Sequence, residues 1–150
     1  MFSLTNVVFS YQKYKVINKV SFSLESGQHL SILGESGSGK STLLKLIYGL
    51  EDVDEGQIYW NHTQISGPKF NLVPGMSFIK YLAQDFDLMP FITVRENIGK
   101  YLSNFYPEKK QERISDLLRL VEMTDFLDVK VKNLSGGQMQ RVAIARVLAL

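Results

Sequence analysis

The positions of hydrophobic residues divide the chain into two parts with different periodicity. Up to about Leu82, short apolar runs bounded by turn residues predict β-strands. The predicted strands cover residues 7–11, 16–24, 29–33, 57–60 and 77–82. Residues 61–64 are expected to form a turn, and residues 66–75, which include two prolines, a surface loop. The first part is therefore expected to be rich in β-structure.

From Asp85 onward the apolar residues recur at helical spacing. A capping-box pattern at residues 93–96 predicts a helix that carries Ile98, Tyr101 and Leu102. Another helix is predicted from Pro107, since proline suits the first helical position. Its apolar residues recur at i, i+3, i+4 and i+7, at Ile114, Leu117, Leu118 and Val121. The second part is therefore expected to be helical.

A complete phosphate-binding loop interrupts the β-rich part. Its residues are Gly34, Glu35, Ser36, Gly37, Ser38, Gly39, Lys40 and Ser41. The glycines allow successive N–H groups to turn inward around an anion, and the helix expected at residues 40–49 adds its positive end. Lys40 supplies a charge for the outer phosphates, and the Ser41 hydroxyl can ligate Mg²⁺. The preceding apolar run and the following helix favour this interpretation over a glycine-rich surface turn.

A second phosphate-binding pattern opens the last predicted helix. Its residues are Leu134, Ser135, Gly136, Gly137 and Gln138. Ser135 can cap the helix, and the exposed N–H groups of Gly136 and Gly137 form an anion site that needs no side chain. The helix from Met139 to Leu150 is apolar nearly all round, which predicts that it is buried.

These motifs, in this order, resemble the nucleotide-binding domain of an ATP-binding cassette (ABC) ATPase. The resemblance runs from Leu4 to Leu150 and includes Tyr11 ahead of the loop and Gln84 after an apolar run. Residues 140–146 match the family's helix after the LSGGQ motif. The chain departs from the pattern at its end, because the Walker B Asp, the catalytic Glu, the D-loop and the switch His are expected beyond Leu150.

The resemblance implies an α/β fold in one domain without its last part. It implies a P-loop NTPase core, with a RecA-like sheet and an N-terminal antiparallel β part, and the ABC helical subdomain. On this basis residues 1–84 are expected to form the core, residues 85–134 the helical subdomain and residues 135–150 the signature helix.

The resemblance also implies roles for individual residues. ATP is expected at Tyr11, the loop residues 34–41, Thr42 and Gln84, and the facing subunit's ATP at residues 134–138. Mg²⁺ would be held by Ser41 and Gln84, and the catalytic residues within the chain would be Lys40 and Gln84.

Some of these residues have a plainer interpretation. A lone Gln84 could be a solvated amide at a strand end. An aromatic residue on a strand usually packs, and Tyr14 competes with Tyr11 for the adenine. His29 and His62 have no partner at metal-binding spacing and are not expected to hold zinc. Trp60, Phe70 and Phe78 are expected to be packing residues.

The function implied by the resemblance is that of an ABC transporter's ATP-hydrolysing subunit, with ATP and Mg²⁺ as cofactors. A second nucleotide-binding domain and transmembrane permease subunits would be its partners, and ATP-driven dimerisation would energise transport. Because the catalytic carboxylates are expected beyond Leu150, the 150 residues alone are expected to be inactive or weakly active. An ATP-binding module that does not hydrolyse, or the ATPase of a non-transport ABC protein, remains an alternative.

Composition limits the cellular locations and the binding partners that are expected for the chain. The net charge of +2 is too small to indicate nucleic acid as a partner. The chain has no cysteine, which excludes disulfides within it and suits a reducing compartment. No signal peptide or membrane-spanning segment is apparent, since Arg146 interrupts the most apolar stretch. The expected location is cytoplasmic, at the membrane face only through the permease.

Overall fold

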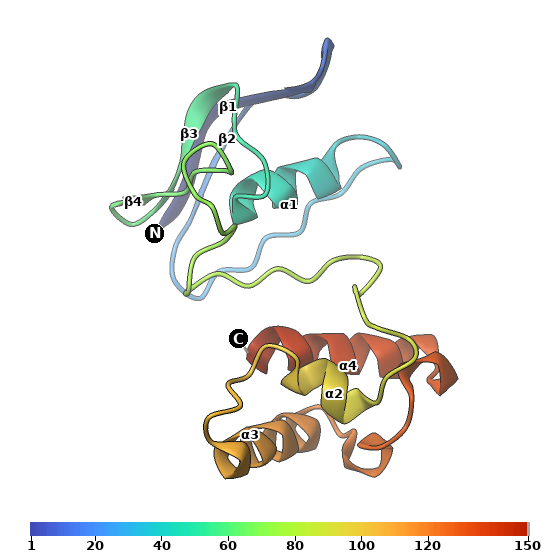
Figure 1. The fold of residues 1–150 in the computed structure, drawn as a ribbon. Coiled ribbons are helices and arrows are strands. Elements are labelled where there is room, and N and C mark those ends of the chain that lie inside the picture. Colours follow the sequence, from blue (N-terminus) through green and yellow to red (C-terminus); the bar gives the residue numbers. More distant parts are fainter. Residues whose placement is uncertain (150) are drawn as a thin grey trace. The chain divides into compact units, whose positions relative to one another are not determined.

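The computed structural model describes residues 1–149. The chain divides into two compact units, Met1–Ile79 and Lys80–Leu150. The first unit contains all the strands of the described residues, and the second contains helices joined by turns and irregular segments, with one isolated β-bridge between Thr93 and Lys130 (Figure 1). The expected change from β-rich to helical texture is therefore confirmed.

A four-stranded antiparallel sheet forms the first unit together with one helix. The strands are β1 (Phe2–Tyr11), β2 (Tyr14–Leu24), β3 (Glu55–Trp60) and β4 (Thr63–Gln64), in the order β2-β1-β3-β4. All neighbouring strands are antiparallel, as expected for the N-terminal β part. The strands predicted at 7–11, 16–24 and 57–60 are confirmed. The turn predicted at 61–64 is shorter than expected, because residues 61 and 62 form it and Thr63–Gln64 is strand β4, which pairs with β3.

Helix α1 (Lys40–Tyr48) packs its apolar side against this sheet. It ends at Gly49, whose φ of 84° is the left-handed conformation of a typical glycine C-cap. Leu43 and Leu46 of α1 are buried in one cluster with strand residues. The strand residues of this cluster are Phe2, Leu4, Val7, Phe9, Ile17 and Ile58.

Two predicted strands are wrong: residues 29–33 and 77–82 are irregular. An isolated apolar run becomes a strand only when a neighbour pairs with its backbone groups, and no described strand pairs with either segment. Leu33 is accordingly 90% exposed. The loop predicted at 66–75 is confirmed, but Phe70 within it is exposed and is not a packing residue.

Three α-helices form the second unit. They are α2 (Val94–Gly99), α3 (Pro107–Leu120) and α4 (Gly136–Ala149), with short 3₁₀ turns at Thr124–Phe126 and Val131–Asn133. Their common core includes Ile98, Ile114, Leu118 and Val142. The predicted helix after residue 93 is shorter than expected, since it ends at Gly99, and Tyr101 beyond it is exposed.

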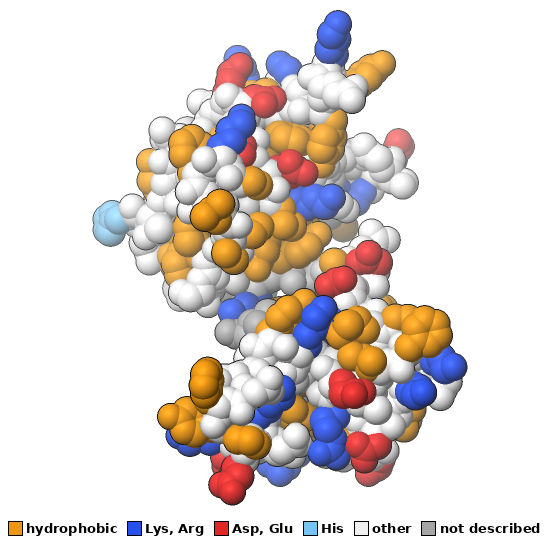
Figure 2. All heavy atoms as spheres, viewed as in Figure 1, with side chains coloured by type: hydrophobic (Ala, Val, Ile, Leu, Met, Phe, Trp, Pro, Cys, Tyr) orange, Lys and Arg blue, Asp and Glu red, His pale blue; other side chains and the backbone are white. Residues whose placement is uncertain are grey.

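Hydrophobic side chains also reach the surface of both units. Figure 2 shows them in orange on the face in view. In the second unit Phe91, Phe105 and Leu120 are largely exposed. Within the described residues, none of the helices combines the length and the hydropathy that crossing a membrane requires.

Candidate functional site

The glycine-rich loop at residues 34–41 leads directly into α1. Gly37 and Gly39 have φ of 83° and 91°, a left-handed conformation that is costly for other residues. Gly39 is the N-cap of α1, no side chain caps the helix, and its first turn holds no acidic residue. A helix start of this kind presents unoccupied amides and a positive dipole end to an anion.

The Lys40 side chain folds back over the loop. Its ammonium group donates hydrogen bonds to the carbonyl oxygens of Gly34, at 2.9 Å, and Glu35, and to the Ser38 hydroxyl at 3.4 Å. These acceptors are neutral, and in the described part of the chain no carboxylate forms an ion pair with Lys40. The charge is therefore available to phosphate oxygens.

The loop rests against the first residues of β2. A Cβ on Gly39 would lie 3.0 Å from Val16 Cγ1 and 3.1 Å from the Val16 carbonyl oxygen. The tip of the β1–β2 hairpin, where Tyr11 pairs with Tyr14, lies only a few residues from this contact. Tyr11 is 42% exposed with its ring against Phe9 at 4.8 Å, whereas Tyr14 is 77% exposed. Both rings can thus reach solvent.

The other residues of the predicted nucleotide site are accessible. Glu35, Ser36 and Ser41 are exposed, and Thr42 is half-buried. The Ser41 hydroxyl therefore fits a role as a Mg²⁺ ligand. Among the residues that the structure describes, no group of three acidic, histidine or cysteine side chains could hold a metal ion. Protein ligands within this part would be few, which suits Mg²⁺, an ion that keeps waters and phosphate oxygens around it.

Gln84 belongs to the second unit. It lies in a turn closed by the hydrogen bond from the Phe86 N–H to the Ala83 carbonyl oxygen, at 3.1 Å. The side chain is exposed, and within the described residues its amide makes no hydrogen bond. The residue is thus free to take an external ligand.

The second phosphate-binding pattern begins α4 with a capping box. The Ser135 N–H donates to Gln138 Oε1 at 2.8 Å, and the Gln138 N–H donates to Ser135 Oγ at 3.4 Å. Leu134, just before the box, is buried in the core. Of the four amides that a helix start leaves unpaired, the box satisfies those of Ser135 and Gln138. The exposed Gly136 and Gly137 amides have no partner among the described residues.

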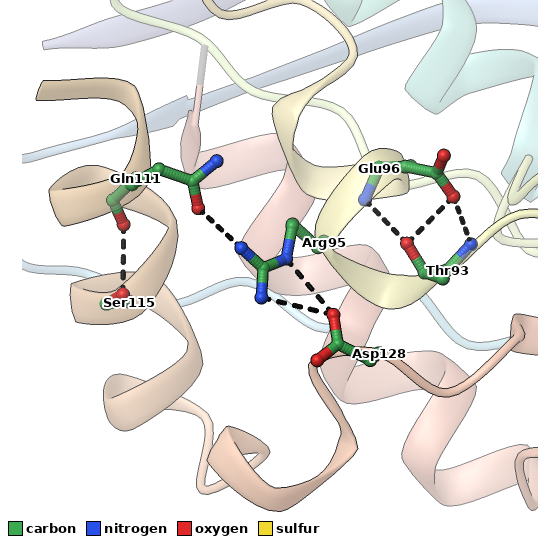
Figure 3. A network of polar contacts seen from close by, with 6 residues as sticks. All are labelled: Thr93, Arg95, Glu96, Gln111, Ser115 and Asp128. Atoms are coloured by element: carbon green, nitrogen blue, oxygen red, sulfur yellow. Dashed lines mark hydrogen bonds and ion pairs between the residues drawn. The ribbon is translucent and has the colours of Figure 1, made fainter. Parts of the chain in front are cut away.

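Helix α2 begins with the same kind of box, which Figure 3 shows at Thr93 and Glu96. Its two middle amides are occupied, because the Val94 and Arg95 N–H groups donate to the carbonyl oxygens of Val129 and Leu127, each at 3.0 Å. All four amides at the start of α2 are therefore satisfied. The comparison distinguishes a structural cap at α2 from a helix start at α4 that retains two donors.

The polar groups around α2 serve the fold. The pKa of Glu96 is lowered below its ordinary 4.5, first because the Thr93 N–H donates to the carboxylate and then because the Thr93 hydroxyl does so. Arg95 joins α2 to Asp128 at 3.1 Å and to Gln111 of α3 at 3.0 Å (Figure 3). These contacts hold the helices of the second unit together.

A cleft of about 600 Å³ lies elsewhere in the first unit. Its lining is mostly apolar and includes Phe22, Leu30, Ile32, Leu44 and Trp60. None of the loop residues 34–41 lines it. The phosphate-binding loop is thus separate from this apolar cleft.

Two buried polar residues were not among the predicted site residues. Asn97 is fully buried, and Arg146 is 6% exposed. The sequence does contain a signal for Arg146, because this arginine interrupts an otherwise apolar helix face. It contains no comparable signal for Asn97. Both bind the backbone that follows Gln84.

Comparison with known proteins places these features in one family. The family profile described as "ABC transporter" matches residues 17–150. The chain is 37% identical over 146 residues to the spermidine/putrescine import ATP-binding protein PotA of Roseobacter denitrificans, covering 96% of this chain and 39% of that protein. It is 36% identical over 151 residues to the Fe(3+) ions import ATP-binding protein FbpC 2 of Haemophilus influenzae, covering 99% and 42%. The chain thus spans about two fifths of the length of these relatives.

Solved structures give the same result. One is an ATP-binding cassette in a dimeric, post-hydrolysis state bound to ADP and Pi, with a TM-score of 0.78 and 31% identity over 99% of this chain and 69% of that chain. A second dimeric structure of the same protein, the bacterial ABC transporter cassette MJ0796, gives a TM-score of 0.79 at 32% identity, with the same coverage. The expected fold class, part of an ABC cassette with an N-terminal antiparallel sheet, is confirmed.

Proposed function

Because this chain belongs to the ABC transporter family, we propose that it is the ATP-binding part of a subunit that hydrolyses ATP to energise a transmembrane permease. The observation that carries the proposal is the pair of unoccupied amides at Gly136 and Gly137, in a helix start whose other amides are capped. Together with the loop at residues 34–41, it gives the chain two backbone sites suited to phosphate. In ABC cassettes, ATP is bound by a phosphate-binding loop of this kind in one subunit and by a helix start of this kind in the facing subunit.

At the first site the chain's own groups bind and orient the triphosphate. The loop amides and the start of α1 hold the inner phosphates, and Lys40 exchanges its carbonyl acceptors for outer phosphate oxygens. Tyr11, exposed at the hairpin tip, stacks on the adenine. Ser41 and Gln84 would hold Mg²⁺, which neutralises charge on the β- and γ-phosphates when bound.

At the second site Ser135, Gly136 and Gly137 bind the γ-phosphate of nucleotide held by a facing cassette. This arrangement makes ATP part of the interface between two copies, or between this chain and a second cassette. The two dimeric structures of one cassette that this chain resembles support the assembly. The permease and a location at the cytoplasmic face of the membrane follow from the same role.

The cargo is a separate matter from the ATPase role. Relatives named for polyamine import and for ferric-ion import match this chain almost equally, at 37% and 36% identity. The similarity supports the energising function that these relatives share, and no cargo is proposed.

One observation favours a second candidate, an ATP-binding module that does not hydrolyse. The described residues contain no group of three acidic, histidine or cysteine side chains, the kind of group that can supply a general base for water beside a metal ion. Phosphate release from MgATP separates the candidates: turnover supports the ATPase, whereas ATP-driven dimerisation without turnover supports the module.

Lys40→Ala tests the nucleotide site. Hydrogen bonds to charged groups contribute about 1.5–3 kcal/mol, so ATP should bind roughly 10- to 100-fold more weakly. AMP has no outer phosphates, so its affinity should change little in this variant. Binding is measured by calorimetry, with Lys45→Ala as the control because Lys45 lies at the other end of the same helix and the net charge changes equally. Equal losses for ATP and AMP would refute the role given to Lys40.

A further inference from the structure

The two buried polar side chains noted above hold the same short segment. Among the described residues, Asn97 and Arg146 are the buried side chains with polar or charged groups. Both bind main-chain atoms of residues 86–89, the four positions that begin two residues after Gln84. Buried polar groups cost free energy unless their hydrogen bonds are satisfied, so their convergence on one segment calls for a specific explanation.

Arg146 of α4 binds this segment with three hydrogen bonds. Its Nη1 donates to the Asp87 carbonyl oxygen, and its Nη2 donates to the Phe86 carbonyl oxygen at 3.2 Å and to Asp87 Oδ2 at 3.0 Å. The planar guanidinium donates from two nitrogens in fixed directions, which suits two successive carbonyls and a carboxylate. The contact therefore uses the fork geometry of arginine as well as its charge.

The backbone that Arg146 holds is strained. Phe86 and Asp87 have φ of 63° and 48°, so two successive non-glycine residues are left-handed. The left-handed conformation is unfavourable for residues with a Cβ and persists only where surrounding contacts hold it. The carbonyls of these two residues are the ones that Arg146 binds. Loss of its guanidinium should therefore let the turn that carries Gln84 relax.

Stability alone does not account for a buried arginine at this position. Its helix neighbours Val142, Ala143 and Ala145 are buried and apolar. An apolar side chain of similar volume in place of a buried ionic group is often neutral or stabilising. The Asp87 side chain is 76% exposed, so this ion pair adds little. What arginine supplies here is the position of a backbone segment.

Asn97 of α2 holds the other end of the segment. Its Oδ1 accepts from the Met89 N–H at 2.9 Å, and its Nδ2 donates to the carbonyl oxygens of Met89 and Thr93, each at 3.0 Å. Residues 86–89 are thus attached to α4 at one end and to α2 at the other. The turn at Gln84 has a rigid base within the second unit.

We propose that Arg146 is a positioning residue for Gln84. Its guanidinium attaches the left-handed turn at Phe86 and Asp87 to α4, the helix whose first residues bind the facing nucleotide. Gln84 and the Gly136 and Gly137 amides then belong to one rigid body, so a displacement at either is transmitted to the other. The inference rests on the proposed function for the role of Gln84, but the attachment itself does not.

The first measurement needs no nucleotide. Amide hydrogen exchange is followed by NMR on the full chain at the Phe86 N–H, which closes the turn at Gln84. Arg146→Gln should speed exchange there by about tenfold or more, since it removes at least one charge-assisted hydrogen bond. Arg119→Gln is the control, because Arg119 is an exposed arginine paired with Asp116 on α3. Unchanged exchange at Phe86 in Arg146→Gln would overturn the proposal.

If Arg146→Gln unfolds the second unit, seen as lost protection throughout α3, Arg146→Lys decides. Lysine keeps the charge but donates from one nitrogen and lacks the planar fork that here reaches the two carbonyls from two nitrogens, so the Phe86 amide should still exchange faster while the α3 amides stay protected. Full protection of Phe86 with lysine would show that the guanidinium fork is not needed and would overturn the proposal.

The second measurement links the attachment to Gln84. The ratio of ATP affinity with and without Mg²⁺ is compared for Gln84→Ala, Arg146→Gln and the double variant. Both single variants should lower the ratio, and the double variant should be no lower than Gln84→Ala, because both act through one group. Additive losses would overturn the proposal. Absence of ATP binding by the unmodified chain would refute the proposed function instead, and the exchange measurement would still decide the attachment.

Discussion

Substitution of Gly56 tests how closely β3 lies against β1. Gly56 has a φ of 85°, and a Cβ there would lie 2.4 Å from the carbonyl oxygens of both Thr5 and Asn6. Gly27 is a matched control, with a φ of 82° and nothing within 4 Å of its Cβ. The left-handed conformation alone costs an alanine about 1–2 kcal/mol. Pushing the backbone of β1 away should cost about 1–3 kcal/mol more at Gly56.

The expected loss for Gly56→Ala is therefore about 2–5 kcal/mol, a large part of a typical stability of about 5–15 kcal/mol. The assay is urea unfolding followed by Trp60 fluorescence. Trp60 is the one tryptophan of the chain and lies in β3 itself, so its signal reports the first unit. Gly27→Ala should lose only the free energy of unfolding that the left-handed conformation costs, about 1–2 kcal/mol. Equal losses for the two variants would refute the close approach of β3 to β1.

Three further outcomes follow from the helix starts. Gly137→Asp adds a carboxylate at the start of α4, where the helix dipole favours a negative charge by about 0.3–1 kcal/mol, so the thermal stability should not fall. Light scattering should show no MgATP-driven dimer of this variant, because the carboxylate repels the facing phosphate. A dimer that persists would contradict the role of this helix start. The lowered pKa of Glu96 means that its charged form stabilises the fold above about pH 4.5. The stability difference between the unmodified chain and Glu96→Gln should therefore shrink as the pH falls through the lowered pKa, and a difference independent of pH in urea titrations would contradict this. Arg95→Met should cost at most about 1 kcal/mol, because its ion pair with Asp128 is solvent-exposed; a larger loss on thermal unfolding would contradict that estimate.

Features that depend on near neighbours in sequence were predictable. The capping box at Thr93, proline at the start of α3 and glycine at the end of α1 each act within one turn of a helix, and all three are present. The amphipathic spacing in α3 likewise predicted its buried side, at Ile114, Leu117 and Leu118. The family itself followed from two local motifs.

Features that depend on distant partners were not predictable in this way. Residues 29–33 are as apolar as a strand, but strand formation also requires a neighbouring backbone, which local composition does not report. The occupancy of the amides at Val94 and Arg95 comes from residues more than 30 positions away in the chain, at Leu127 and Val129. The capping pattern alone therefore could not tell the start of α2 from the start of α4.

The contrast between these two helix starts has a consequence for large-scale mutagenesis. At α2 the middle amides are part of the fold, so a proline at Arg95 removes a bonded N–H and should lower the amount of protein that accumulates in cells. At Gly136 and Gly137 an added Cβ meets nothing within 4 Å, so alanine variants there should accumulate normally. A mutational scan that scores protein abundance and cell growth separately would then distinguish the two segments, because substitutions at the start of α2 lower abundance and those at Gly136 and Gly137 do not. Residues whose substitution leaves abundance unchanged but slows growth would outline the phosphate-binding surface.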